Sequence, residues 1–155
     1  LALDSNDTVL CPHGDFLCDQ THSILTGYSK GNLVYLQMSP ESPSGLAEQI
    51  HQSITSFGYI PQRHVPTEDK LVAHCAYCQP IQMSRYAIID LTGAVFDLMY
   101  EIGLLHALGI PVLLIRAAGK PLDKFQSNLN VVEYTSVEVA RKIIDKWLKS
   151  VTILE

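Results

Sequence analysis

The sequence predicts a single α/β domain built on a parallel sheet with helices over both faces. Short β-type runs alternate with helical patterns from about residue 30 onward. The most apolar runs are continuous rather than alternating, as in strands that are covered on both faces. The 155 residues, 47% of them hydrophobic and only 17% charged, suit one compact domain and exclude disorder as the main state.

The first half of the pattern contains two strands and the helix between them. Residues 32–38 read as a buried strand, and residues 46–57 carry apolar side chains at helical spacing. Gly58 is a natural helix stop, so a second strand is expected at residues 59–65. The polar composition of this second strand places it nearer the edge of the sheet.

The second half repeats the alternation. Residues 69–83 have apolar side chains at helical intervals, although Pro80 is expected to kink or end that helix. Residues 86–91 form a continuous apolar run that contains Asp90, which is typical of a central parallel strand. The remaining predicted elements are a helix at 96–108, a strand at 111–115, a strand at 130–134 and an amphipathic helix at 137–151.

Five strands alternating with helices predict a flavodoxin-like or Rossmann-like three-layer sandwich, because right-handed crossovers place helices on both faces of the sheet. Ligands of such sheets bind beyond the carboxyl ends of the strands, where the strand order reverses. The loops after Met38, Asp90 and Ile115 are therefore the expected binding loops. Residues 1–30 do not follow the pattern, so we expect an N-terminal extension or linker there and the domain itself at residues 31–155.

Charge and hydropathy narrow the classes of partner. The net charge of −5 disfavours nucleic acids and anionic membranes and favours a small-molecule ligand. The best apolar run, residues 102–115, is too short and too interrupted to span a membrane. Residues 1–7 lack the basic and apolar regions of a signal peptide, and the missing initiator Met suggests a processed or excised fragment. We expect a cytoplasmic location.

Two acidic residues are the candidates for chemistry. Asp90 ends the predicted central strand, and Glu101 lies in the next helix, four residues after Asp97 and on the same helical face. A carboxylate near a helix N-terminus is favoured in its ionised form, and it can act as a nucleophile or stabilise a developing sugar cation. This suits chemistry at a glycosidic bond. The alternative is that Asp90 caps a helix and Glu101 is a solvated surface acid.

A family resemblance adds to this interpretation. Residues 88–93 read Ile-Ile-Asp-Leu-Thr-Gly, and residues 100–115 read Tyr-Glu-Ile-Gly-Leu-Leu-His-Ala-Leu-Gly-Ile-Pro-Val-Leu-Leu-Ile. Together these motifs resemble the signature of nucleoside 2-deoxyribosyltransferase-like and TIR-like nucleotide-binding domains. The resemblance extends over about residues 32–148, and residues 35–40 match the strand and loop that face the base or sugar in the family.

The resemblance implies that a nucleoside or nucleotide binds beyond the strand ends, without a cofactor. Glu101 stands at the position of the family's catalytic glutamate, which attacks the anomeric carbon to form a covalent sugar ester before a base or water accepts the sugar. TIR-type enzymes similarly break the nicotinamide glycosidic bond of NAD. Asp90 would accept a sugar hydroxyl or exchange a proton with the base, and Gly93 would let the backbone approach the ligand closely. The family also implies a homo-oligomer, in which a neighbouring subunit can complete the site. The other expected substrate-binding residues are Gln37, Met38, Ser39, Thr92, Asp97 and Tyr100.

The chain departs from the family pattern at one place. The family commonly has two asparagines in the loop between the two motifs, where this chain has Val95 and Asp97. Asp97 can substitute as an acceptor, but the side chain of Val95 forms no hydrogen bonds. An alternative function is therefore a non-catalytic nucleotide sensor or TIR-like assembly module within a larger signalling protein.

Cysteines and basic residues offer two further candidate sites. Cys11, Cys18, Cys75 and Cys78 form a possible zinc-ligand set together with nearby histidines, but Cys75 and Cys78 fall on an apolar helical face where a buried thiol is the default. We therefore predict no metal. No glycine-rich dinucleotide motif or phosphate loop is present. Arg116 and Lys120 follow the fourth predicted strand, where they either meet a phosphate or belong to a solvated loop.

Overall fold

The computed structural model describes residues 31–63, 78, 80–93, 96–120 and 128–153. Within this part of the chain, five parallel strands form one sheet in the order β2-β1-β3-β4-β5. This is the strand order of the flavodoxin-like fold. The strands are β1 (Leu33–Gln37), β2 (Ile60–Arg63), β3 (Tyr86–Asp90), β4 (Val112–Ala117) and β5 (Val131–Tyr134).

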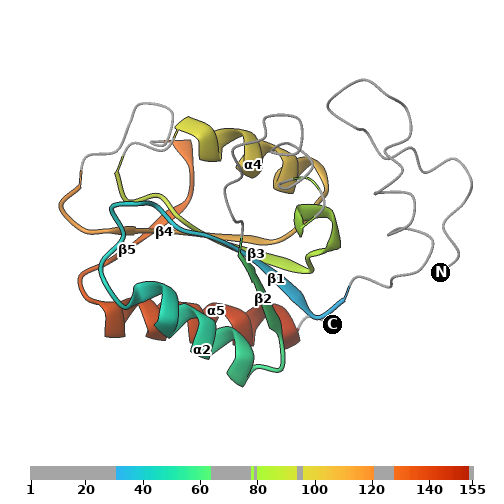
Figure 1. Ribbon diagram of the computed structural model, residues 1–155, viewed down its shortest axis with the longest axis horizontal. Coiled ribbons are helices and arrows are strands. Elements are labelled where there is room, and N and C mark those ends of the chain that lie inside the picture. The colour runs from blue at the N-terminus through green and yellow to red at the C-terminus, as the bar shows by residue number, and fades with distance from the viewer. Residues whose placement is uncertain (1–30, 64–77, 79, 94–95, 121–127, 154–155) are drawn as a thin grey trace, which may run out of the picture.

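Helices cover both faces of the sheet (Figure 1). Helix α2 (Leu46–Ser56) and helix α5 (Val137–Ile153) lie together on one face, and helix α4 (Phe96–Ala107) lies on the other. The predicted three-layer sandwich is confirmed. The predicted strands and these three helices agree with the observed ones to within about two residues at most ends, and β4 continues two residues beyond the expected Ile115.

The centre and one edge of the sheet are where the sequence pattern placed them. All five residues of β3 are buried, as expected for a continuous apolar run between two helical layers. Strand β2, which was predicted to lie near the edge from its polar composition, is an edge strand with no fully buried residue.

Two hydrophobic cores lie on the two faces of the sheet, because successive strand residues point to opposite sides. Along β3, Tyr86 and Ile88 contribute to the core under α2 and α5, whereas Ala87 and Ile89 contribute to the core under α4. Along β1, Leu36 points to the α2 and α5 side, and Tyr35 points to the α4 side. This alternation decides which face each polar residue near the strand ends occupies.

The predicted helix at 69–83 is described only in part, and the predicted N-terminal extension is not described. Of the predicted helix at 69–83, residues 78 and 80–83 are helical, and the chain leaves the helix at Ser84. Residues 1–30, and with them the expected extension, lie outside the described part of the chain. Within the described residues, no helix combines the length and apolarity that a bilayer crossing demands.

Candidate active site

The carboxyl ends of β1, β3 and β4 lie side by side at one edge of the sheet. The chain runs from β1 outward to β2 and then returns past β1 to β3, so the strand order reverses between β1 and β3. Sheets of this kind bind ligands beyond such a reversal. The candidate site is therefore built from the loops that follow these three strands and from α4.

Glu101 lies on the buried side of α4. Its neighbours Ile102 and Leu105 belong to the core on this face of the sheet, and Glu101 is only 2% exposed. The hydroxyl of Tyr35, from the middle of β1, donates a hydrogen bond of 2.8 Å to Glu101 Oε2. The alternative of a solvated surface acid is therefore wrong for Glu101. Burial of a carboxylate is costly unless donors satisfy it, and Tyr35 is one such donor.

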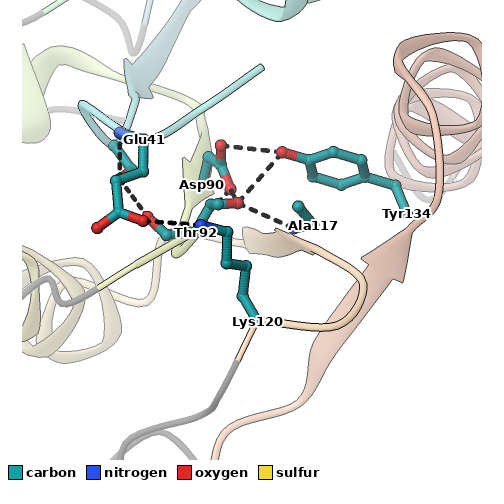
Figure 2. Close-up of polar contacts among 7 residues, drawn as sticks. Glu41, Asp90, Thr92, Ala117, Lys120 and Tyr134 are labelled. Atoms are coloured by element: carbon teal, nitrogen blue, oxygen red, sulfur yellow. Dashed lines mark hydrogen bonds and ion pairs between the residues drawn. The ribbon is translucent and has the colours of Figure 1, made fainter.

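Asp90, at the end of β3, is fully buried and accepts four hydrogen bonds. Figure 2 shows its contacts with Thr92 and Tyr134. Its Oδ1 accepts from the Thr92 amide at 3.1 Å and from the Thr92 hydroxyl at 2.6 Å. Its Oδ2 accepts from the hydroxyl of Tyr134 at 3.2 Å and from that of Ser42. Asp90 thus connects the ends of β3 and β5 with the loop after β1.

Thr92 extends this network to β4 and back to the loop after β1. Its hydroxyl accepts a hydrogen bond of 2.9 Å from the amide of Ala117, and its carbonyl accepts one from the hydroxyl of Ser39. Thr92 and Ser39 are both buried. The loops that surround the candidate site are therefore joined by side-chain hydrogen bonds of small polar residues.

Tyr134 supplies a neutral donor to this network. The pKa of Tyr134 is raised to about 12, mainly by burial and also by the adjacent carboxylate of Asp90, while the hydrogen bond to Thr92 acts in the opposite direction. The phenol therefore keeps its proton at neutral pH and donates to Asp90.

The two candidate acids point to opposite faces of the sheet. Asp90 follows Ile89 on β3, so it points toward the α2 and α5 side, where it meets Tyr134. Glu101 lies on the α4 side with Tyr35. They belong to one edge of the sheet but to different hydrogen-bond networks.

The other expected binding residues divide between these faces. Gln37 follows two residues after Tyr35 on β1, so strand alternation puts it on the α4 side, and Met38 packs against the core on the α2 and α5 side. Gly93 has a φ of 89°, and Tyr100 is 48% exposed on α4. The side chain of Asp97 and the whole of Val95 lie outside the described part of the chain.

Three residues of these networks were not among the predicted site residues: Tyr35, Ser42 and Tyr134. Tyr35 and Tyr134 sit in apolar strands, where a tyrosine is read as core. A hydroxyl within a buried strand needs a hydrogen-bond partner, so a tyrosine in such a strand could have indicated that a polar group lies nearby. Ser42 lies in the loop after Met38, which was an expected binding loop, but its Ser- and Pro-rich sequence did not single out this serine.

The remaining candidates are only partly described. Cys78 is buried and its Sγ accepts a hydrogen bond of 2.8 Å from Gln82, whereas Cys11, Cys18 and Cys75 lie outside the described residues. In the part of the chain that the structure covers, no three His, Cys, Asp or Glu side chains are grouped as metal ligands.

Neither a family model nor any curated protein sequence matches the chain. The fold does occur in a solved structure. The Clostridium botulinum CMP N-glycosidase BcmB superposes with a TM-score of 0.55 at 14% identity, over 74% of this chain and 98% of that one. The Francisella novicida lysine decarboxylase LdcF has a TM-score of 0.49 at 14% identity, over 81% of this chain and 18% of the decarboxylase. At these identities, the likeness to the N-glycosidase shows a shared fold.

Proposed function

We propose that this domain binds a nucleoside or nucleotide beyond the carboxyl ends of β1, β3 and β4, and that it cleaves or transfers the N-glycosidic bond with Glu101 as the nucleophile. The observation that carries the proposal is the buried Glu101 carboxylate, which Tyr35 holds by a 2.8 Å hydrogen bond next to the reversal of strand order. The fold shared with a CMP N-glycosidase and the motif that contains Glu101 support the same chemistry.

The proposed reaction has two steps. An oxygen of Glu101 forms a bond to the anomeric carbon while the bond from that carbon to the base nitrogen breaks, and the base leaves with the electron pair and takes up a proton. Water or a second base then attacks the same carbon and releases the carboxylate. Two displacements at one carbon give net retention of configuration. Exclusion of water around Glu101 favours the attack, because the carboxylate is poorly solvated.

Tyr35 and Asp90 have positioning roles in this proposal. Tyr35 fixes the orientation of the Glu101 carboxylate. Both oxygens of Asp90 already accept hydrogen bonds from the protein, so Asp90 orders the loops that receive the ligand. Self-association, which the family resemblance implies, stays a prediction.

Release of free base tests the proposal. We expect the protein to release base from at least one member of a panel of ribonucleosides, deoxyribonucleosides, their 5′-monophosphates and NAD, as followed by chromatography. Glu101→Gln keeps an acceptor for Tyr35 and removes the nucleophile, so the rate is expected to fall by about 10³-fold or more. Intact-mass measurement during turnover is expected to show a sugar adduct on the wild-type chain.

A matched control is available on α2. Glu48 is exposed and pairs only locally with Gln52 at 3.1 Å, so Glu48→Gln is expected to retain full activity. Equal base release by wild type and Glu101→Gln would refute the catalytic role. Ligand binding without any base release would favour the alternative function as a nucleotide sensor.

A further inference from the structure

The carboxylate of Glu41 lies directly over the backbone of Gly93. A Cβ atom built on Gly93 would be 2.5 Å from Glu41 Oε1 and 2.6 Å from its Cδ, so the acid occupies the space that any other residue at this position would need. Gly93 lies in the connection from β3 to α4, at the end of the Ile-Ile-Asp-Leu-Thr-Gly motif. A carboxylate from the loop after β1 thus sits against the backbone beside the proposed ligand site.

Lys120 pairs with this carboxylate (Figure 2). Its Nζ lies 3.1 Å from Glu41 Oε2, and Arg116 fixes the turn that carries it by donating a 2.6 Å hydrogen bond to the Lys120 carbonyl. Arg116 also forms an ion pair with Glu133 on β5. Arg116 on β4 and Lys120 in the turn after it are therefore each paired with an acid.

Among the described residues, the charge that these ion pairs leave at this edge is negative. Asp90 is buried and accepts its hydrogen bonds from hydroxyl groups and an amide, so neither Lys120 nor Arg116 offsets its carboxylate. The other cation at the strand ends among the described residues is Arg63, on the edge strand β2, and β1 separates that strand from β3. A phosphate placed near Gly93 would bring further negative charge against Glu41 and would have to displace it from Lys120.

We propose that Glu41 is a specificity-determining residue that selects uncharged nucleosides over their 5′-monophosphates. This inference rests on the proposed function for the position of the ligand. Glu41 accepts hydrogen bonds from sugar hydroxyls and repels a phosphate, so discrimination comes from an unfavourable contact with the wrong ligand. The Glu41 and Lys120 side chains are 52% and 48% exposed, so salt screens the repulsion and the discrimination shrinks at high ionic strength.

Binding measured separately from turnover tests the inference. Isothermal titration is carried out in the Glu101→Gln protein, so that no bond breaks, with the four ribonucleosides, their 5′-monophosphates and inorganic phosphate. We expect nucleosides to bind about tenfold or more tightly than their monophosphates at low salt. Adding Glu41→Gln is expected to reduce this ratio by about tenfold, because Lys120 becomes available to the phosphate.

Two further variants show where the effect arises. Lys120→Met in the Glu41→Gln background is expected to abolish the gain in phosphate affinity, whereas Glu48→Gln on α2 leaves every affinity unchanged. Tighter binding of monophosphates than of nucleosides with Glu41 present overturns the inference. It is equally overturned if neither monophosphates nor inorganic phosphate gain affinity in Glu41→Gln.

The outcomes separate this inference from the proposed function. Binding of inorganic phosphate to Glu41→Gln through Lys120 supports the role of Glu41. If the protein releases no base from any nucleoside, the catalytic proposal is refuted. The catalytic proposal is supported if the protein releases base. The role of Glu41 is refuted if kcat/KM is the same for nucleosides and for monophosphates, both in the wild type and in Glu41→Gln.

Discussion

The hydroxyl of Tyr35 on β1 donates a 2.8 Å hydrogen bond to the carboxylate of Glu101 on α4, 66 residues later in the chain. Both residues are buried on the face of the sheet that α4 covers. The bond ties the proposed nucleophile to a rigid central strand, which is the arrangement that precise attack geometry requires.

Removing this bond is expected to impair chemistry more than binding. Tyr35→Phe should lower kcat about ten- to hundredfold with little change in KM, since a hydrogen bond to a charged group contributes roughly 1.5–3 kcal/mol. Steady-state kinetics on the best substrate of the panel would measure this. Tyr59→Phe is the control, because the Tyr59 hydroxyl lies on the other face of the sheet at 3.4 Å from Thr152. A rise in KM with constant kcat would contradict a positioning role for Tyr35.

The Asp90 network is expected to determine stability. Asp90→Asn replaces one carboxylate oxygen by an amide nitrogen, which then faces two of the four donors, so we expect a loss of about 2–3 kcal/mol in the free energy of unfolding, measured by urea denaturation. Asp145→Asn on α5 removes a 3.8 Å pair with the half-exposed Arg141 and should change it by less than about 0.5 kcal/mol. Equal effects of both substitutions would argue against the network.

Tyr134 links stability to alkaline pH. Burial raises its pKa from 10.0 to about 12, so the unfolded chain loses this proton before the folded chain does as pH rises. The contribution of Tyr134 is therefore fully present below about pH 10 and is lost as pH rises from there through about 12. The stability difference between wild type and Tyr134→Phe should shrink over that range in urea titrations, because all other titrating groups are common to both. A difference that stays constant would refute the linkage.

Gly93 and Gly119 form a matched pair for the contact with Glu41. Both have positive φ, 89° and 80°, but a Cβ on Gly119 would meet nothing within 4 Å. Gly119→Ala should therefore cost only the backbone strain, about 1 kcal/mol. Gly93→Ala should cost up to about 1 kcal/mol more, because the half-exposed Glu41 side chain has to move aside and lose its ion pair with Lys120. In a Glu41→Ala background, the loss in the free energy of unfolding caused by Gly93→Ala should equal the loss caused by Gly119→Ala, as measured by thermal or urea unfolding. A persistent excess would mean that Glu41 is not the obstacle.

The layers of the fold follow from local patterns in the sequence. The continuous apolar run of β3 predicted a central strand, and the polar residues of β2 predicted an edge. These inferences succeed because burial on both faces or on one face leaves a direct imprint on each strand. The motif that contains Asp90 and Glu101 likewise indicated the edge of the sheet where the polar networks occur.

The connections within the site could not be inferred in the same way. Asp90 meets Tyr134, 44 residues away, and Glu41 meets Lys120, 79 residues away. Such contacts depend on the exact positions of strand ends and loops, which periodicity does not encode. That Asp90 and Glu101 lie on opposite faces of the sheet could not be predicted either, because the alternation of a strand cannot be extended through a loop into the next helix.

The Thr92 hydroxyl acts as an extra rung of the sheet. The main-chain ladder between β3 and β4 continues to the bond from the Leu91 amide to the Ile115 carbonyl, and the next amide, that of Ala117, binds the Thr92 side chain at 2.9 Å. The main-chain pairing of β3 and β4 therefore ends where a side-chain oxygen replaces a carbonyl as the acceptor. The end of the β3–β4 pairing thus depends on one hydroxyl group, and hydrogen exchange at the Ala117 amide reports on local opening of this contact.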